Sequence, residues 1–283
     1  MLNSSPLISV NGVVGQQISP LDRGFAYGDG LFETCRILQG RLPLWELHLA
    51  RLAAGCEQLR LGFDRAQVER YRDDLWQQSN PAGGIFKLTL TRGAGGRGYL
   101  FPADSSPTVC MGIYQAPPVN PHWQGVTLRV CQHRLASNPV LAGVKHLNRL
   151  EQVLARNEWQ DPAIADGLML DYQGQVIETT SSNIFCYQQG ELLTPVLDQC
   201  GVAGVMRAFI CNKLAPSLGI PVRETRLDLA QLLRADELMI CNAVHGIWPV
   251  LSVVGTDFSR PAVGRIARLL QEALLVEFPL ESI

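Results

Sequence analysis

The sequence has few lysines and few charged residues. Charged residues make up 18% of the 283 residues, below the usual share of about 25%. Lys87, Lys145 and Lys213 are the only lysines among 24 basic residues, so the other 21 are arginines. A reaction that requires a lysine amine therefore has three candidates. With 26 acidic residues, the formal charge is −2, and no block of like charge argues for nucleic-acid binding.

Three further absences bear on location and on metal binding. No apolar run approaches the ~20 residues of a membrane-spanning helix, and the first residues lack the basic and apolar segments of a signal peptide. The eight cysteines include no Cys-x2–4-Cys pair, which would indicate a zinc site. Scattered thiols are typical of a reducing compartment. We therefore expect a cytoplasmic protein with free cysteines, no membrane segment and no metal centre.

What is present is enough apolar sequence for a large core. Hydrophobic residues make up 47% of the chain, and this length suggests two domains at roughly 150 residues per domain. Three prolines in residues 116–121 interrupt helix and strand alike, which predicts a linker there. We expect a small N-terminal α+β domain over residues 1–115 and a larger domain over residues 122–283.

The order of the expected elements favours the α+β class. Strands and helices follow one another without the regular alternation of a doubly wound sheet. The spacing of Asn148 and Glu151 resembles a capping box at the start of a helix. Strands are expected over 7–14 (a hairpin), 31–38, 85–91, 108–114, 126–132, 167–171, 176–179 and 237–241, and helices over 44–59, 148–159, from 204 onward, and over 261–278.

A glycine-rich motif at residues 93–98 matches the G-x-G-x-x-G pattern of dinucleotide-binding proteins. That pattern needs a helix to begin at the motif, so that its amide groups face the pyrophosphate. Pro102 and Pro107 rule out a helix there. We expect instead a flexible glycine loop that presents Arg97, the alternative being a plain surface turn.

Lys145 has the most unusual setting of the three lysines. It lies between the apolar residues Val144 and Leu147, just before a predicted helix. Lys87 falls on the polar phase of a strand, and a solvated lysine explains Lys213 well. Apolar surroundings lower the pKa of an amine, so Lys145 is a candidate nucleophile or base near neutral pH. A surface lysine at a helix start is the alternative, and the local sequence leaves both open.

Glu178 follows two apolar residues in the predicted strand 176–179. A carboxylate that points toward a core needs a cationic partner. One candidate partner is an arginine, and the other is the protonated ring nitrogen of a pyridoxal cofactor, which needs that proton to act as an electron sink. The residues alone do not choose between them.

Two positions are suited to binding a phosphate. Small residues over 201–207 stand at the start of a predicted helix, where backbone N–H groups and the helix dipole favour an anion. Arg51 lies on the otherwise apolar stripe of the predicted helix 44–59. Each has a simpler explanation, a helix cap or an arginine paired with a core carboxylate. Together with one special lysine and one core glutamate, they describe an aldehyde cofactor that carries a phosphate.

Motifs from residue 10 to residue 250 resemble those of the fold-type IV pyridoxal-phosphate enzymes, the group of the branched-chain and D-amino-acid aminotransferases. The glycine loop and the segment from Lys145 to Gln152 are most similar to the aminodeoxychorismate lyases within that group. The motifs are Asp22-Arg23-Gly24, Tyr27-Gly28-Asp29-Gly30-Leu-Phe-Glu-Thr34, His48-Leu-Ala-Arg51-Leu52, Arg92-Gly-Ala-Gly-Gly-Arg-Gly-Tyr99, Lys145-His-Leu-Asn-Arg-Leu-Glu-Gln152, Glu178-x4-Asn183, Gly204-Val-Met-Arg207 and Cys241-Asn-Ala243.

The resemblance implies roles for individual residues. Lys145 holds pyridoxal 5'-phosphate covalently and is the catalytic residue. The aminotransferases usually carry Gly-Thr where this chain has Asn242-Ala243, which leaves Asn242 free to face substrate. The implied cofactor-binding residues are Lys145, Glu178 at the pyridine nitrogen, Asn183 at the ring hydroxyl, Arg51 and the N–H groups of Val205 and Met206 at the phosphate, and Ala243; the implied substrate-binding residues are Arg97, Tyr27 and Asn242.

The resemblance also implies an architecture and an activity. The fold is a small α/β domain plus a larger pseudo-barrel domain, with the site at the domain and dimer interface of a homodimer. The implied reaction splits 4-amino-4-deoxychorismate into 4-aminobenzoate and pyruvate for folate synthesis. The alternative within this fold is an aminotransferase for D-amino or branched-chain substrates. From another class, the alternative is a non-catalytic protein that binds or carries the cofactor.

Overall fold

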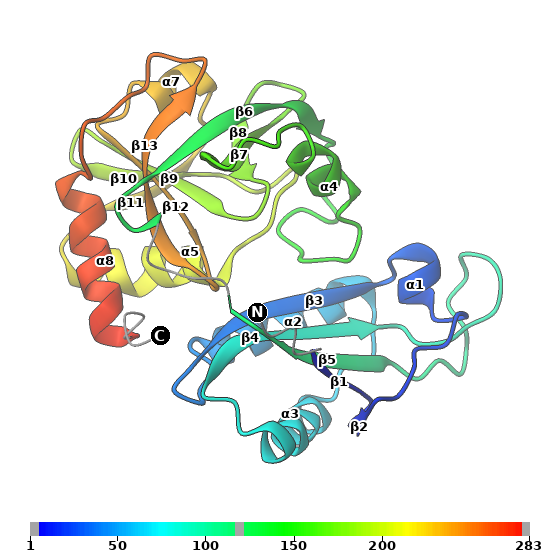
Figure 1. Ribbon diagram of the computed structural model, residues 1–283. Helices are drawn as coiled ribbons and strands as arrows, with labels where there is room; N and C mark the ends of the chain where they lie inside the picture. The colour runs from blue at the N-terminus through cyan, green and yellow to red at the C-terminus, as the bar shows by residue number, and fades with distance from the viewer. Residues whose placement is uncertain (1–5, 117–121, 279–283) are drawn as a thin grey trace. The chain divides into compact units, whose positions relative to one another are not determined.

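The computed structural model describes residues 6–116 and 122–278 and divides into two compact units (Figure 1). Unit 1 consists of Met1–Pro117 and Val144–Asn148, and unit 2 of Pro118–Gly143 and Arg149–Ile283. Apart from Ala116, the predicted linker lies outside the described residues. None of the helices in the described ranges is long and apolar enough to span a bilayer.

Unit 1 is a five-stranded antiparallel sheet with three helices. The strand order is β2-β1-β5-β4-β3, so β3 forms one edge. Asn11 and Gly12 both have positive φ, at 49° and 82°, as a tight hairpin turn between β1 and β2 requires. The elements are β1 (Leu7–Val10), β2 (Val13–Val14), α1 (Arg23–Tyr27), β3 (Gly30–Leu38), α2 (Trp45–Leu59), α3 (Arg65–Ser79), β4 (Gly83–Thr91) and β5 (Thr108–Tyr114).

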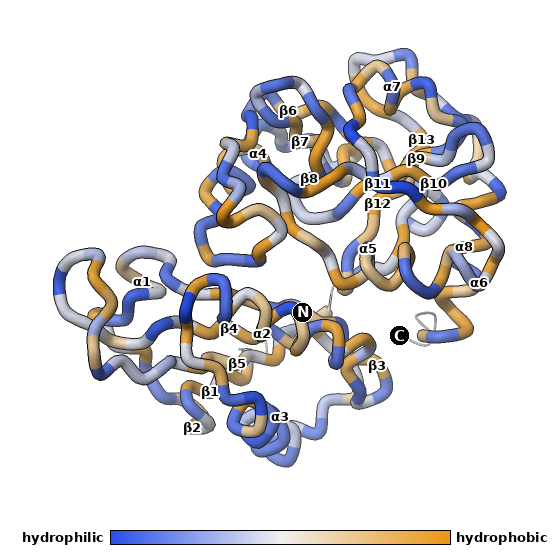
Figure 2. The backbone as a smooth tube through the Cα atoms, turned by 180° about the vertical axis from the view of Figure 1, so that it is seen from behind, coloured by the Kyte–Doolittle hydropathy of each residue, from blue (hydrophilic) through white to orange (hydrophobic). Residues whose placement is uncertain are grey.

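Helices α2 and α3 cover one face of this sheet. The alternation of β4 places Phe86, Leu88 and Leu90 on that face, all fully buried. They form one apolar cluster with residues of both helices, among them Leu52 of α2 and Leu75 of α3. Figure 2 shows α3 as largely hydrophilic along its length, because only a narrow stripe of an amphipathic surface helix faces the core.

The segment Val144–Asn148 belongs to unit 1, although the sequence places it beyond the predicted linker. It runs along the exposed edge of β3, where the Phe32 N–H donates to the Lys145 carbonyl at 3.1 Å. The Leu147 N–H donates to the Gly30 carbonyl at 3.0 Å. An edge strand offers unpaired backbone groups, and this segment satisfies some of them. The assignment of these residues to the larger domain therefore needs correction.

Unit 2 is built on an eight-stranded mixed sheet with order β11-β10-β9-β12-β13-β6-β7-β8. The sheet curls back on itself in Figure 1, and the N–H of Val176 in the edge strand β8 donates to the carbonyl of Leu227 at 2.7 Å, two residues past the opposite edge strand β11. The strands are β6 (Val126–Leu135), β7 (Ile164–Asp171), β8 (Val176–Thr179), β9 (Asn183–Gln188), β10 (Glu191–Pro195), β11 (Val222–Thr225), β12 (Glu237–Asn242) and β13 (Gly246–Val254).

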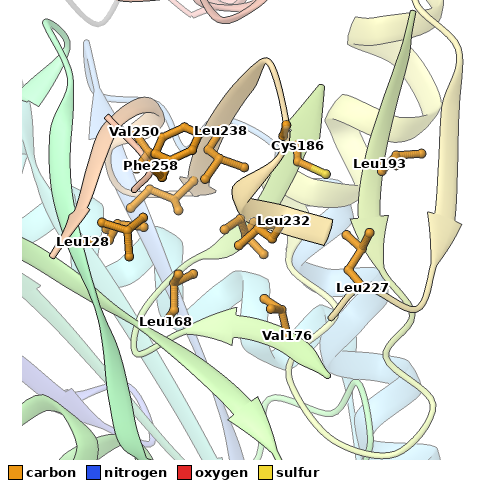
Figure 3. Close-up of a cluster of buried hydrophobic side chains, with 14 of the residues drawn as sticks. Leu128, Leu168, Val176, Cys186, Leu193, Leu227, Leu232, Leu238, Val250 and Phe258 are labelled. Atoms are coloured by element: carbon orange, nitrogen blue, oxygen red, sulfur yellow. The ribbon is translucent and has the colours of Figure 1, made fainter. Parts of the chain in front are cut away.

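The curled sheet of unit 2 encloses an apolar core. Its residues come from the strands, from α7 and from the connecting loops, and Figure 3 shows Leu128, Leu168, Leu232, Leu238 and Phe258 pointing toward one another. All five are at most 1% exposed. The helices of unit 2 are α4 (Leu150–Arg156), α5 (Val205–Phe209), a π-helical turn (Ile210–Leu214), α6 (Ala215–Ser217), α7 (Leu229–Leu233) and α8 (Arg265–Glu277).

The α+β prediction is confirmed, and most of the predicted strands and helices form. The predicted capping box is wrong, because α4 begins at Leu150 with Arg149 as an N-cap that makes no side-chain bond. The Asn148 side chain donates instead to the Gly28 carbonyl at 3.1 Å. The Glu151 carboxylate accepts from the backbone of Ala136 at 2.8 Å. Tertiary hydrogen bonds thus replace the local ones.

Candidate functional site

Lys145 is held by unit 1 at the edge of β3. Its backbone pairs with Phe32, and its Nζ lies 4.3 Å from the centroid of the Phe32 ring, a distance at which a cation and a ring attract. The side chain is half-buried. By contrast, Lys87 is exposed on β4, and Lys213 is 60% exposed and pairs with Glu277 at 2.9 Å. Among the three lysines, Lys145 is thus the one whose side chain is half-buried.

Arg51 lies on α2 with its guanidinium against Glu33 of β3. The Arg51 Nε donates to Glu33 Oε1 at 2.8 Å, and the Arg51 Nη2 donates to Glu33 Oε2. His48, one helical turn before Arg51, places its Nδ1 2.6 Å from Glu33 Oε2. The side chains of Glu33 and His48 are 1% and 0% exposed. We call these three residues the Glu33 cluster.

The protonation states within the Glu33 cluster follow from burial and charge. Burial raises the pKa of Glu33, but the Arg51 charge and the His48 hydrogen bond outweigh burial and bring it to about 2. Burial lowers the pKa of His48, and the bond to Glu33 opposes that shift only in part. At neutral pH the cluster therefore holds a carboxylate, a guanidinium and a neutral imidazole. The positive charge of Lys145 also lowers the pKa of His48, so Lys145 interacts electrostatically with the Glu33 cluster.

The glycine loop is anchored by two buried arginines that share Asp29. The Arg92 Nε and Arg23 Nε donate to Asp29 Oδ2 at 2.8 and 2.9 Å. Burial raises the pKa of Asp29, but hydrogen bonds and charges of the two arginines outweigh it, so the net shift is downward. Arg23 also donates to the Gly98 carbonyl at 2.9 Å. The loop is therefore pinned next to Arg97, which is itself exposed.

Tyr27, the last residue of α1, lies against the same loop. Its hydroxyl accepts from the Gly98 N–H at 3.2 Å, and its ring packs edge-on against Tyr99 with 5.6 Å between centroids. No helix forms between β4 and β5, all of whose connecting residues are described, so the structure agrees with rejecting a dinucleotide-binding motif. Tyr27 and Arg97, both expected to bind substrate, are brought together with the loop in unit 1.

In unit 2, the side chains of Glu178 and Asn183 both hydrogen-bond the backbone of Val202. Glu178 Oε2 accepts from the Val202 N–H at 2.8 Å, and the Asn183 side chain donates to the Val202 carbonyl at 2.8 Å. The other carboxylate oxygen lies 3.4 Å from the Gln152 side-chain nitrogen. Glu178 and Asn183 are 4% and 6% exposed. Donors on both carboxylate oxygens stabilise a buried negative charge.

The segment held in this way leads directly into α5. Its N-cap Gly204 makes no side-chain cap bond, and the Ala208 N–H donates to the Gly204 carbonyl at 2.9 Å. The N–H groups of Val205 and Met206 precede that bond, at a helix start of the kind that binds phosphate. A Cβ on Gly204 would lie 1.9 Å from Asn183 Oδ1. Only glycine fits between Asn183 and the helix start, so the close contact with the Asn183 side chain explains why a glycine precedes α5.

Asn242 is the last residue of β12, and Ala243 begins the turn that leads to β13. The Asn242 Oδ1 accepts from the backbone of Val244 and of His245, both at 2.9 Å. Its side-chain nitrogen lies 3.2 Å from the Ser181 carbonyl. The expectation that Asn242 is free to face substrate therefore meets a side chain whose oxygen shapes the turn and whose nitrogen donates to the Ser181 carbonyl and the Ser182 hydroxyl. Ala243 is half-buried in that turn and has no hydroxyl to offer a phosphate.

Each unit, taken by itself, carries its own set of polar groups. Unit 1 supplies an amine and guanidinium groups, whereas unit 2 supplies a buried carboxylate, an amide and helix-start donors. In the described ranges, no three His, Cys, Asp or Glu side chains gather in a way that could hold a metal ion. This donor set fits pyridoxal 5'-phosphate, which needs an amine, a partner for its ring nitrogen and donors for its phosphate.

Several residues of these networks carry roles that sequence reasoning did not assign. Glu33, Asp29 and Gln152 stand in the quoted motifs, but no function was attached to them. For Glu33 a signal exists, because it is a charged residue in an apolar phase of β3 that continues with Cys35 and Ile37. Nothing in the sequence predicts the hydrogen bonds of Val202, because its partners Glu178 and Asn183 lie on β8 and β9, away from Val202 along the chain.

The chain is similar to known proteins over nearly its whole length. The model of the amino-transferase class IV family matches residues 30–253. The chain is 38% identical over 267 residues to aminodeoxychorismate lyase of Vibrio harveyi, covering 93% of this chain and 97% of the relative. It is 31% identical over 260 residues to a putative branched-chain-amino-acid aminotransferase of Methanocaldococcus jannaschii, covering 90% and 89%.

A solved structure shows the same architecture. The crystal structure of 4-amino-4-deoxychorismate lyase from Pseudomonas aeruginosa superposes with a TM-score of 0.90 at 43% identity, and the alignment covers 96% of this chain and 99% of the other. The predicted two-domain fold-type IV architecture is confirmed. The chain belongs to the amino-transferase class IV family.

Proposed function

We propose that the protein is a pyridoxal 5'-phosphate-dependent lyase that converts 4-amino-4-deoxychorismate to 4-aminobenzoate and pyruvate, a step of folate biosynthesis. The observation that carries the proposal is the near full-length identity to two lyases of this name, 38% and 43%. The identity to a putative branched-chain aminotransferase is lower, 31%, which leaves the aminotransferase as the second candidate.

Different residues of the chain are assigned to different parts of the cofactor. Lys145 binds it covalently, and Glu178 faces its ring nitrogen as a carboxylate with donors on both oxygens. The phosphate is bound by Arg51 and by the N–H groups of Val205 and Met206, with the turn at Ala243 beside it. Asn183 would bind the ring hydroxyl, and its side-chain nitrogen donates to the Val202 carbonyl just before the helix start.

When bound, the cofactor supplies an electron sink conjugated to the amine-bearing carbon of the substrate. Lys145 would hold the cofactor at rest and would be free to act as a base once the substrate amine is bound. Lys145 then removes the proton from the amine-bearing carbon, and the bond between the neighbouring carbon and the enolpyruvyl oxygen breaks. Lys145 returns the proton to the methylene carbon of the leaving enolpyruvate, so pyruvate leaves and an aromatic ring remains.

Substrate binding falls to the exposed part of unit 1. The substrate carries two carboxylates, and a planar guanidinium can bind a carboxylate with two hydrogen bonds. Arg97 is exposed on a loop that Arg23 and Tyr27 pin at Gly98, so it is assigned to one carboxylate. Tyr27 lines the same region. Asn242 contributes by shaping the turn rather than through a free amide.

The proposal includes a homodimer in the cytoplasm. The eight cysteines all lie in the described part of the chain and are free thiols, which suits a reducing compartment. Unit 1 exposes large apolar side chains, with Phe25 at 79%, Tyr99 at 86% and Leu100 at 90%. Exposed apolar patches are typical of contacts between subunits. Light scattering on the purified protein measures the mass, and a monomer would remove this part of the proposal.

Turnover without a keto acid distinguishes the candidates. A lyase regenerates its cofactor in each cycle, so purified protein with 4-amino-4-deoxychorismate should release 4-aminobenzoate and pyruvate in equal amounts over many turnovers. An aminotransferase stops after one equivalent and resumes only when 2-oxoglutarate is added, and that result would replace the lyase assignment. A colourless protein that binds no cofactor would remove both enzymes.

A further inference from the structure

Glu33 is a charged residue in an otherwise apolar row. Side chains of β3 alternate between the two faces of the sheet, and Leu31, Cys35 and Ile37 share the face of Glu33, packed against α2 in an apolar cluster. A carboxylate buried there costs several kcal/mol unless it is paired and hydrogen-bonded. An apolar residue would stabilise the sheet at least as well, so the packing of unit 1 does not explain why a glutamate stands there.

The hydrogen bonds of Glu33 show what the carboxylate does. It takes the edge of the Arg51 guanidinium formed by Nε and Nη2, with two roughly parallel bonds. A guanidinium is a rigid plane with two bidentate edges, so a partner on the first edge fixes the plane and the direction of the second, formed by Nη1 and Nη2. His48 bonds the same carboxylate at 2.6 Å and limits its rotation.

We propose that Glu33 is a positioning residue that aims the second edge of Arg51 at the phosphate of the cofactor. His48 supports this role through its hydrogen bond to the Glu33 carboxylate. This inference rests on the proposed function, in which Arg51 binds that phosphate. It assigns to the Glu33 cluster the task of making Arg51 a directed bidentate ligand rather than a flexible charge. Without Glu33, the long Arg51 side chain would lose rotamer freedom on binding the phosphate, which weakens binding.

Charge and orientation predict opposite effects for the loss of Glu33. A carboxylate near a phosphate repels it, so replacing Glu33 with a neutral residue would strengthen phosphate binding if charge alone mattered. Orientation predicts the reverse, since glutamine keeps one acceptor oxygen and cannot accept from both Arg51 nitrogens and His48. The sign of the change therefore separates the two effects.

The test compares two ligands on the full-length protein after removal of its cofactor. Dissociation constants are measured for pyridoxal 5'-phosphate and for pyridoxal, which lacks the phosphate, with the original protein and with Glu33→Gln. We expect binding of pyridoxal 5'-phosphate to weaken about tenfold, the range of one charged hydrogen bond, and binding of pyridoxal to stay the same. Arg51→Ala should weaken the binding of pyridoxal 5'-phosphate further than Glu33→Gln does. The double variant should bind it no more weakly than Arg51→Ala alone.

Glu46→Gln is the matched control. Glu46 lies on the same helix α2 and pairs with Arg65 at 3.0 Å, but its side chain is 73% exposed, so its loss should leave both ligands unaffected. If Glu33→Gln fails to fold, Glu33→Asp is measured in its place, because the shorter side chain keeps the charge but not the reach to both nitrogens. The same phosphate-specific loss is expected of it.

The outcomes separate the inference from the proposed function. If the original protein binds neither ligand, the proposed function fails. If it binds both and the variant loses affinity for both equally, Glu33 supports only the fold of unit 1. A phosphate-specific gain in affinity would show that charge decides. Either of the last two results overturns the inference while the proposed function stands.

Discussion

Replacing Glu178 with alanine separates two tasks that one carboxylate performs. The Glu178 side chain accepts the Val202 N–H at 2.8 Å and is 4% exposed. Alanine would leave this partly buried donor without its acceptor, which costs about 1 kcal/mol of stability, the low end of the range for buried donors. The same change removes the negative charge expected beside the cofactor nitrogen. Removing one partner of a buried charge pair costs about 3–5 kcal/mol.

These two costs appear in different measurements. Loss of the Val202 acceptor lowers the melting temperature of the protein, whereas loss of the charge lowers kcat by about 10²-fold or more, at 1.36 kcal/mol for each factor of ten. Cofactor content should stay close to that of the original protein, because Lys145 and Arg51 still hold the cofactor. The measurements are kcat, absorbance of the bound cofactor and thermal unfolding, all on one preparation.

Glu237 provides a control with the same structural duty. Its carboxylate accepts from the backbone of Ile266 and Ala267 at 3.0 and 2.9 Å at the start of α8, and it has no assigned part in the reaction. Glu237→Ala should lower the melting temperature by a similar amount and leave kcat unchanged. Near-normal turnover of Glu178→Ala with bound cofactor would refute the role of the carboxylate and reduce Glu178 to a support of the Val202 segment.

Three further outcomes are expected. Borohydride reduction of the yellow holoenzyme should attach the cofactor to Lys145, as peptide mapping reads out, and an adduct on Lys87 would contradict the assignment. Arg97→Ala should raise KM for 4-amino-4-deoxychorismate and leave the absorbance of the bound cofactor unchanged; an unaltered KM would mean that the loop is a plain surface turn. The folded pKa of Glu33, about 2, lies below the ordinary 4.5, so its contribution of about 3 kcal/mol is present above pH 4.5 and lost as the pH falls toward 2. Acid titration of stability should accordingly be flatter in Glu33→Gln than in the original protein over that interval.

Local patterns in the sequence were sufficient for most of the fold. Alternation of apolar residues predicts β4 and β5 closely, and Asn11-Gly12 predicts the hairpin whose positive φ values the structure shows. Periods of two and 3.6 are properties of a single element, so they survive without knowledge of the neighbours. The failure at Asn148 and Glu151 has the same origin, because their side chains bond residues distant in sequence.

The candidate site is predictable in its residue types but not in its connections. Lys145 stands out through its apolar flanks, and Glu178 through its place in an apolar strand. That Lys145 pairs with β3 across more than a hundred residues is set by the free edge of that strand. Arg51 shows where sequence reasoning ends. The sequence leaves open whether Arg51 binds a phosphate or pairs with a core carboxylate, and it does not identify that carboxylate. The structure shows the carboxylate to be Glu33.

The resulting site has many polar side chains that act on other protein groups. Glu178 and Asn183 hold Val202, and through it the helix start at Gly204; Asn242 holds the turn that contains Ala243. Backbone N–H groups that face an anion are useful only if they converge, and an isolated loop does not keep them convergent. Buried side chains that hydrogen-bond the loop from two directions supply that rigidity. The spacing of Glu178-x4-Asn183 follows from this arrangement, because Glu178 on β8 and Asn183 at the start of β9 must both reach the backbone of Val202.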